Sequence, residues 1–323
     1  MRSLSVFSLG LSLLLGALWA GSAWAQQDCH PGNLAAHLCD RTGDMVADPP
    51  DDPRRHVDPR VLIFAYTPVE DPAVYARVWA GFIDHLQNVT GKRVQFFPVQ
   101  SNAAQLEAMR AGRLHIAGFN TGSTPLAVNC AGFVPFTMMA REDDSYGYEM
   151  EIIVRADSDI EALSDLRGRR LAFTQPTSNS GYKAPVALLE AEGLTEGDYR
   201  SAFSGKHDNS ILGVINRDYD AAAIANSVLR RMLARGVIEP DQYRSLYRSD
   251  RFPTTAFGHA HNLKPELAAK VREAFFSFPW EGSELEAEFR ESGEAQFIPI
   301  TYTEHWAAIR EIDELTGVSY QCR

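Results

Sequence analysis

Short apolar runs alternate along the chain with segments in which apolar residues recur every three or four positions. The first run, 61–66, is continuously apolar, as expected for a strand buried on both faces of a sheet. The next segment opens on Asp71 and Pro72, which favour the start of a helix, and keeps helical spacing up to Gly91. This pattern predicts a strand followed by a helix.

The same alternation recurs through most of the chain. Further strands are predicted at 94–99, 114–117, 171–173, near 202, at 219–222 and at 243–247. Further helices are predicted at 101–110, 180–192, 208–216, 225–234, 265–278, 283–292 and from 303 onward. Repeated strand–helix units are typical of α/β proteins, so we expect mostly parallel sheets flanked by helices.

Two extended segments divide these units into two series. An extended crossover is predicted at 149–154, and the segment 252–259 is expected to return the chain. We therefore expect a first lobe formed by 61–148 with 257–323, and a second lobe formed by 149–256. Ligands of open α/β sheets bind beyond the carboxyl ends of the strands, so the predicted site is the cleft between the lobes.

The N-terminal region has the features of an export signal. A single cation at Arg2, an apolar stretch and the tripeptide Ala-Trp-Ala predict a signal peptide at 1–25 that is cleaved after Ala25. The residues before Cys29 differ from those that precede a lipidated cysteine, so we expect a mature protein free in the periplasm. Residues 26–60, rich in aspartate and proline, are expected to form an irregular leader on the surface.

Composition narrows the class of partner. The chain has 323 residues with a net charge of −11, which argues against nucleic acid or an anionic membrane as partner. An acidic protein can still bind a small anion, because local donors and dipoles govern a small site.

Four cysteines enter an oxidising compartment, where disulfides persist. Three of them, Cys29, Cys39 and Cys322, lie near the chain ends, and the fourth is Cys130. We expect a disulfide that pins the N-terminal segment, either to itself or to Cys322. The cysteine spacings match no zinc pattern, and no metal site is expected.

The strongest candidate for ligand binding is the segment PTSNSGY at 176–182. It follows a predicted strand and begins a helix, where free amides and the helix dipole favour an anion. Ser178, Asn179 and Ser180 add side-chain donors, and Gly181 is included among the expected ligand-binding residues. The alternative is that one hydroxyl merely caps the helix and Gly181 eases a turn.

A second segment, SGKHDNS at 204–210, lies at the next predicted strand-to-helix junction. It would place His207 at the same cleft, although a capping or solvent-exposed histidine is the alternative. The neighbouring aspartate suggests hydrolase chemistry, but the chain has no G-x-S-x-G elbow, activated nucleophile or recognisable carboxylate pair. We expect a binding protein rather than an enzyme.

Loops at the ends of the first lobe's predicted strands carry neutral polar side chains. The candidates on these loops are Tyr66, Asn102, Asn120 and Thr121. Ordinary capping is the alternative for each loop taken singly. The chain lacks a phosphate-binding P-loop and a dinucleotide fingerprint, so no cofactor is expected. His259 and His261 are expected at the surface.

The order of several segments resembles one protein family. FAYTPVEDP, PTSNSGY, SGKHDNSILGV, YDAAAIAN and FPTTAF occur in the order found in phosphate/phosphite/phosphonate solute-binding proteins of ABC transporters. The resemblance extends from Val61 to the C-terminus, and its first lobe is the less specific part. It implies the type II periplasmic binding protein fold, in which two α/β lobes close on a ligand.

The resemblance also implies roles for individual residues. Ser178, Asn179, Ser180, His207 and Tyr148 would hold the oxyanion. Members that bind aminoalkylphosphonates carry acidic partners for the amine where this chain has Ser227 and Thr255, and a tyrosine where it has Asn102. A desolvated ammonium without a carboxylate would be costly, so phosphate, phosphite or a small phosphonate without an amine is expected.

Two kinds of partner follow from the resemblance. The first is an ABC transporter permease, served by a monomeric receptor. The second follows from relatives that act as arsenite-binding sensors for a histidine kinase. In that alternative Cys130 would be the arsenic ligand, although a cysteine at this point more often packs as a small hydrophobic residue.

Overall fold

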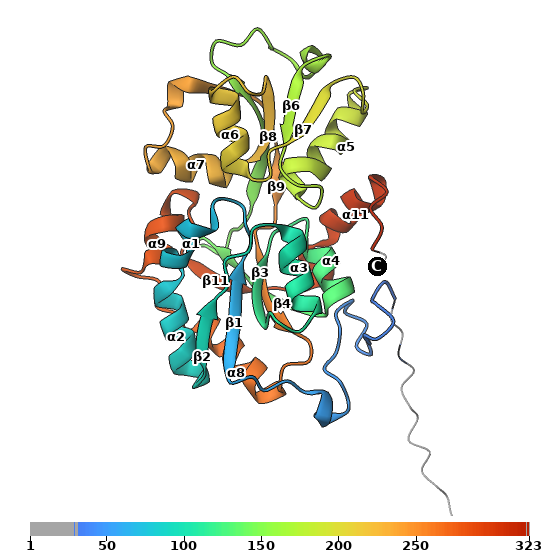
Figure 1. The fold of residues 1–323 in the computed structure, drawn as a ribbon, viewed down its shortest axis with the longest axis vertical. Coiled ribbons are helices and arrows are strands. Elements are labelled where there is room, and N and C mark those ends of the chain that lie inside the picture. The colour runs from blue at the N-terminus through green and yellow to red at the C-terminus, as the bar shows by residue number, and fades with distance from the viewer. Residues whose placement is uncertain (1–28, 30–31, 321, 323) are drawn as a thin grey trace, which may run out of the picture.

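The computed structural model describes residues 29, 32–320 and 322, which form two α/β lobes, one above the other in Figure 1. The predicted signal peptide, 1–25, lies outside the described residues. The described part of the leader has little regular structure besides a 3-10 turn at Pro53–Arg55.

The lower lobe contains a sheet with the strand order β11-β4-β10-β3-β1-β2. Its strands are β1 (Val61–Tyr66), β2 (Arg93–Phe96), β3 (Ile116–Phe119), β4 (Phe133–Ala140), β10 (Ala256–Ala260) and β11 (Gln296–Pro299). The helices that follow in the same parts of the chain are α1 (Pro72–Val78), α2 (Ala80–Thr90), α3 (Asn102–Arg110), α4 (Thr124–Ala131), α8 (Pro265–Phe276), α9 (Glu284–Phe289), α10 (Tyr302–His305) and α11 (Ala307–Leu315).

The upper lobe contains a second sheet with the strand order β7-β6-β8-β5-β9. Its strands are β5 (Tyr148–Arg155), β6 (Arg170–Phe173), β7 (Arg200–Phe203), β8 (Ala221–Ala225) and β9 (Tyr243–Phe252). Helix α5 (Ala184–Ala191) lies on one side of this sheet, and α6 (His207–Ile215) and α7 (Asn226–Ala234) lie on the other (Figure 1).

Both sheets are mixed, because the crossover strands run against their neighbours. Strands β1, β2 and β3 pair in parallel, whereas β10 is antiparallel to both β3 and β4. In the upper lobe β6 pairs in parallel with β7 and β8, and β5 is antiparallel to β8 and β9. The two-lobed α/β architecture is confirmed, and its strand–helix units supply the parallel part of each sheet.

Local sequence signals locate most element boundaries well. Strand β1 coincides with the predicted run, and the Ser101 hydroxyl accepts a hydrogen bond from the Ala104 amide at 3.1 Å as the N-cap of α3. The single helix predicted up to Gly91 is divided into α1 and α2 at Trp79, which is fully buried. Helix α4 and strands β4 and β11 were not predicted.

The C-terminal helix α11 follows the lower lobe in sequence and packs against both lobes, with Ile309 in the core of the lower lobe and the helix lying beside α5 of the upper one (Figure 1). Ile312 packs against the hydrophobic core of the upper lobe. The Lys183 ammonium and the Asp313 carboxylate form an ion pair at 2.6 Å, with both side chains at most 2% exposed. The C-terminal segment therefore spans both lobes.

All cysteines are paired in disulfides. Cys29 bonds Cys39, which confirms that the N-terminal segment is pinned to itself. Cys130 bonds Cys322 across 192 positions, so the prediction of a packed free thiol or an arsenite ligand at Cys130 is wrong. The tail reaches Cys130 because α11 returns the chain to helix α4, a proximity that sequence spacing does not reveal.

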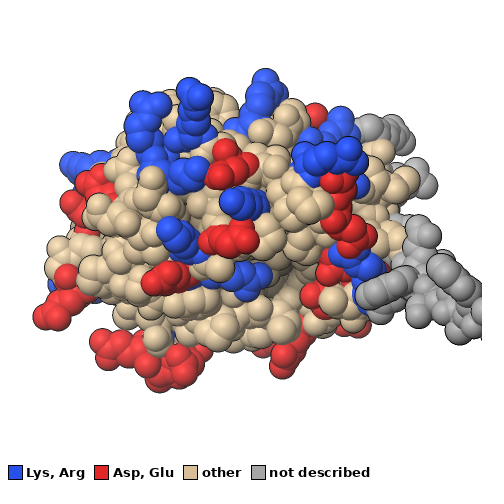
Figure 2. Space-filling view, turned by 90° about the horizontal axis from the view of Figure 1, so that it is seen from below, with Lys and Arg blue, Asp and Glu red and all other residues tan. Residues whose placement is uncertain are grey.

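The outer surface carries charges of both signs. Figure 2 shows the end of the lower lobe, where lysine and arginine side chains lie among aspartate and glutamate. None of the helices in the described part of the chain is long and apolar enough to cross a membrane.

Candidate functional site

A small cavity lies between the lobes, at the ends of strands from both sheets. The space open to the centre of a water molecule inside it is about 50 Å³. Its wall from the upper lobe includes Tyr148, Ser178, Asn179, Ser180 and His207, and its wall from the lower lobe includes Tyr66, Asn120, Thr121 and Thr255. The structure therefore brings together most of the residues predicted from the two lobes.

The serine-rich segment begins with a π-helical turn, Asn179–Lys183, that leads into α5. Such turns are uncommon and occur often at functional sites. The Ser178 hydroxyl accepts a hydrogen bond from the Gly181 amide at 3.1 Å, so the expected capping role is real. Ser178, Asn179 and Ser180 also line the cavity, and the Ser178 hydroxyl keeps its own proton to donate.

Gly181 supports this turn from behind and does not line the cavity. Its carbonyl accepts a hydrogen bond from the Thr174 amide at 2.9 Å. A Cβ atom at this position would lie 2.0 Å from the Thr174 hydroxyl oxygen. Glycine is required because the turn folds back against the end of β6.

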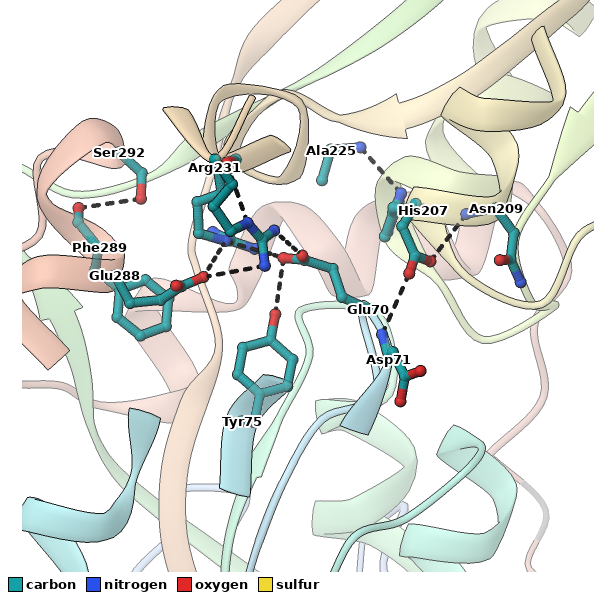
Figure 3. Close-up of polar contacts among 12 residues, drawn as sticks. Glu70, Asp71, Tyr75, His207, Asn209, Ala225, Arg231, Glu288, Phe289 and Ser292 are labelled. Atoms are coloured by element: carbon teal, nitrogen blue, oxygen red, sulfur yellow. Dashed lines mark hydrogen bonds and ion pairs between the residues drawn. The ribbon is translucent and has the colours of Figure 1, made fainter. Parts of the chain in front are cut away.

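His207 is the first residue of α6 and is 4% exposed. Its Nδ1 accepts a hydrogen bond from the Ala225 amide of β8 at 3.1 Å (Figure 3). Burial lowers the pKa of His207 to about 4, so the ring is neutral at pH 7. A neutral ring that accepts at Nδ1 carries its proton on Nε2 and can donate it to an anion.

The buried histidines make a testable contribution to acid sensitivity. Burial also lowers the pKa of His259 to about 4, and this residue is buried rather than at the surface as expected from the sequence. His261 is likewise partly buried, and burial lowers its pKa to about 4. Each ring binds a proton more readily in the unfolded chain, near pH 6.5, than in the folded protein. Stability is therefore fully present above about pH 6.5 and lost as the pH falls towards 4.

We expect the free energy of unfolding to fall between pH 6.5 and 4, with His207 contributing up to about 3 kcal/mol. Urea unfolding at several pH values, in the wild type and in His207→Asn, measures this contribution as a difference in slope. The exposed residue His37 offers the control His37→Asn. Parallel pH profiles for wild type and His207→Asn would contradict the expectation.

The remaining predicted residues fall into two groups. Tyr148 and Thr255 line the cavity directly, as does Tyr66, whose pKa is raised by burial. Asn120 and Thr121 also line it while binding their own neighbours. The Asn120 amide donates to the Thr67 hydroxyl at 3.2 Å, and the Thr121 hydroxyl donates to the Pro253 carbonyl at 2.7 Å.

Asn102 was predicted as a ligand residue, but it is not part of the cavity wall. Its side-chain amide donates to the Thr177 hydroxyl at 2.9 Å, and its backbone amide donates to the Gln175 side chain at 3.0 Å. Asn102 belongs to the lower lobe and both partners belong to the upper lobe. Its role in this structure is to hold the lobes together.

Two charged residues of the cavity wall were missed from the sequence. Arg231 lies on α7 and is 4% exposed, and Glu294 lies between α9 and β11 and is 7% exposed. Arg231 belongs to a run with Arg230 that is typical of a solvated helix face, and Glu294 follows a glycine in a polar turn. Neither carries a motif that would have identified it. Glu294 corrects the expectation of a cavity without a carboxyl group.

Arg231 also belongs to a buried group of charges that we call the interlobe ion-pair cluster, consisting of Glu70, Arg231, Arg235 and Glu288. The Arg231 guanidinium donates to one carboxylate oxygen of Glu70 at 2.8 and 3.0 Å, and Arg235 donates to the other. Figure 3 shows Glu70 between Arg231 and the Tyr75 hydroxyl, which donates to it at 2.9 Å. Glu288 lies 3.5 Å from Arg231 and 3.8 Å from Arg235.

The cluster joins the lobes, because Glu70 and Glu288 belong to the lower lobe, whereas Arg231 lies on α7 and Arg235 is the C-cap of this helix. Burial alone would raise the pKa of Glu70, but the two guanidinium groups outweigh it and hold this pKa below its ordinary value. Glu70 is therefore ionised at neutral pH. Arg231 is therefore both part of the cavity wall and a partner of lower-lobe carboxylates, and these ion pairs exist only while the lobes are in contact.

The backbones of the two lobes are also in close contact with each other. A Cβ atom on Gly122 of the lower lobe would lie 2.4 Å from the Thr177 carbonyl oxygen and 2.5 Å from the Asn179 amide nitrogen. The His207 amide donates to the Val69 carbonyl at 3.2 Å, also across the lobes. The serine-rich turn and the start of α6 are thus both pressed against the lower lobe.

Among the described residues, no group of three or more His, Cys, Asp or Glu side chains could hold a metal ion. The polar groups that face the cavity are mostly hydroxyl, amide, imidazole and guanidinium donors, with one carboxyl group at Glu294. Such a set can surround a small oxyanion, because several donors line a space that corresponds to a few water molecules.

The chain is similar to several known proteins. A family model described as "ABC transporter, phosphonate, periplasmic substrate-binding protein" matches residues 64–306. The phosphate-import protein PhnD of Mycolicibacterium smegmatis is 30% identical over 229 residues, covering 67% of this chain and 71% of that protein. The phosphonates-binding periplasmic protein of Escherichia coli is 24% identical over 255 residues, covering 75% of each.

A solved structure with the same fold is the binding protein component of an ABC phosphonate transporter from Pseudomonas aeruginosa. It has a TM-score of 0.73 and 21% identity, covering 82% of this chain and 90% of that one. PhnD1 from Prochlorococcus marinus in complex with methylphosphonate has a TM-score of 0.70 and 17% identity, covering 80% of this chain and 98% of that one. Because the family model spans most of the chain, this protein belongs to the family of periplasmic substrate-binding proteins of phosphonate ABC transporters.

Proposed function

We propose that this protein binds phosphate, phosphite or a small phosphonate without an amine in the interlobe cavity and delivers it to an ABC transporter permease. The observation that carries the proposal is the convergence of the serine-rich turn and the His207 Nε2–H on one wall of that cavity. A helix-start turn and a neutral imidazole donor together suit an anion with several acceptor oxygens.

The size of the cavity supports a compact ligand. Its water-centre volume of about 50 Å³ corresponds to a few water molecules, since one water requires roughly 10–15 Å³ on this measure. Ser227 and Thr255 line the wall with hydroxyl groups at the places where carboxylates would pair an amine. The carboxyl group of Glu294 is the one feature that could favour an ammonium, so an aminoalkylphosphonate belongs among the ligands to be tested.

The relatives point to the same class of ligand. The mycobacterial relative is named for phosphate import, the Escherichia coli relative for binding phosphonates, and the Prochlorococcus structure holds methylphosphonate. Binding by closure of the lobes would bury the oxyanion between both walls and would form the interlobe ion-pair cluster at the same time.

The remaining parts of the proposal concern the state of the protein in the cell. The signal peptide is cleaved after Ala25, and a monomer without a lipid anchor remains in the periplasm. It has no enzymatic activity of its own. The sensory alternative depended on a free thiol at Cys130, and the disulfide with Cys322 removes its arsenite site.

Isothermal calorimetry with phosphate, phosphite, methylphosphonate and 2-aminoethylphosphonate tests the proposal. We expect binding of at least one of the first three, weakened by His207→Ala and by Ser180→Ala. Asn209→Ala is the matched control, because Asn209 lies on the same helix as His207 and is exposed. Failure of all three amine-free ligands to bind at near-millimolar concentration would overturn the proposed function.

A further inference from the structure

The carboxyl group of Glu294 stands out among the polar groups of the cavity. Gly293, with a φ of +87°, ends the turn after α9, and the chain then enters β11. This geometry brings Glu294 into the cavity wall with only 7% of its surface exposed. Its Oε2 atom is buried and has no hydrogen-bond partner.

The surroundings of this carboxyl group leave its Oε2 atom without a donor. Burial raises the pKa of Glu294, opposed by the Ser292 hydroxyl and the charge of Arg231. Arg231 directs its own hydrogen bonds to Glu70. A buried acceptor without a partner is costly, so a ligand that supplies a proton to Oε2 would gain this hydrogen bond and relieve that cost.

The other polar groups of the cavity need hydrogen-bond acceptors, whereas Oε2 of Glu294 needs a donor. The Ser178 and Ser180 hydroxyls and the His207 Nε2–H can all donate to oxygens of an oxyanion. A tetrahedral ligand that satisfies the whole wall therefore needs several acceptor oxygens and one acidic hydroxyl. Phosphorus oxyanions meet this requirement, because phosphate, phosphite and phosphonates retain an acidic proton when singly charged.

Sulfonates have the same shape but lack that proton in neutral solution. With a sulfonate bound, an oxygen of the ligand would face Oε2 of Glu294 without a hydrogen between them. A carboxylate and a sulfonate that meet in a buried site repel each other strongly, and the Oε2 acceptor would remain unpaired. Uptake of a proton from solution would be needed to remove the repulsion.

We propose that Glu294 is a specificity-determining residue that accepts a hydrogen bond from the acidic P–OH of the ligand and thereby excludes sulfonates. The assignment rests on the proposed function, since it concerns the same cavity. It concerns selectivity between oxyanions of equal shape rather than the binding of the oxyanion head by the upper lobe.

Methylphosphonate and methanesulfonate form a matched pair of probes for this proposal. In calorimetry at neutral pH we expect the wild type to prefer methylphosphonate by at least about a hundredfold, as a site built around a buried polar group does. In Glu294→Gln the amide can donate to a sulfonate oxygen. We therefore expect weaker methylphosphonate binding, stronger methanesulfonate binding and a preference below about tenfold.

Glu291→Gln is the matched control, because Glu291 lies in the same turn and is exposed, and its preference should equal that of the wild type. If Glu294→Gln does not fold, Glu294→Asp keeps the carboxyl group but shortens its reach and should still lower the preference. An unchanged preference in a folded Glu294 variant would overturn the proposal.

A second result would also overturn it. If the wild type binds 2-aminoethylphosphonate more tightly than methylphosphonate and Glu294→Gln removes that difference, the carboxylate pairs an ammonium instead. These outcomes leave the proposed function intact, because the wild type still binds a phosphonate. Failure of the wild type to bind any phosphorus oxyanion would instead overturn the proposed function, and this assignment with it.

Discussion

Replacing Glu70 with glutamine is expected to weaken ligand binding by about a hundredfold, although Glu70 is not part of the cavity wall. Glu70 is the central acceptor of the interlobe ion-pair cluster, with Arg231 and Arg235 on its two carboxylate oxygens. Removing its charge leaves two buried or half-buried guanidinium groups with Glu288 as their remaining partner in the cluster. Removing one partner of a buried, hydrogen-bonded charge pair typically costs about 2–5 kcal/mol of binding free energy.

This cost falls on the closed form, because separated lobes would expose both arginines to water. Calorimetry with the preferred oxyanion measures the loss of affinity, and small-angle scattering with saturating ligand measures whether the protein still becomes compact. Glu286→Gln is the matched control on α9, where Glu286 forms an exposed ion pair with Arg290. Equal affinities of the wild type and Glu70→Gln would show that the cluster does not contribute to closure.

Replacing Lys183 with methionine is expected to lower the free energy of unfolding by about 3–5 kcal/mol. The Lys183 ammonium is paired with Asp313 at 2.6 Å and also donates to the Gly122 carbonyl at 2.8 Å. Burial lowers the pKa of Lys183, although the Asp313 carboxylate opposes this shift. Without the lysine, Asp313 would be a buried carboxylate that keeps, among the described residues, one side-chain hydrogen-bond donor, the Tyr320 hydroxyl at 2.8 Å.

Urea unfolding of the single variants and of Lys183→Met combined with Asp313→Leu separates pairing from packing. The double variant should regain much of the lost stability, because replacing both charges avoids the uncompensated one. Lys270→Met, on the exposed face of α8, is the control for loss of a lysine. A double variant less stable than Lys183→Met would contradict the expectation.

Local sequence signals were sufficient to predict the features that depend on interactions between residues close together in the sequence. The apolar run at β1, the cap at Ser101 and the order of strands and helices follow from neighbours within a few positions. The serine-rich turn and His207 were identified for the same reason, since each lies at a helix start where backbone amides are free. The strand and helix order also separated the chain into the two series that form the lobes.

Other features required the folded chain, because they join residues that are far apart in sequence. Glu294 and Arg231 have no motif, and they reach the cavity only because α9 and α7 converge on it. Asn102 was expected to touch the ligand, but closure of the lobes brings Thr177 and Gln175 to it instead.

The sequence by itself determined most secondary structure elements, the two-lobed α/β class and most of the upper wall of the interlobe cavity, because propensity, capping and periodicity act over short distances. Only the tertiary structure decided the partner of Cys130, the interlobe ion-pair cluster and the buried carboxyl group of Glu294. These depend on which surfaces meet when the chain crosses between lobes at β5 and β10. Charge pairing and burial arise where the surfaces of the two lobes come into contact, and no local sequence pattern encodes them.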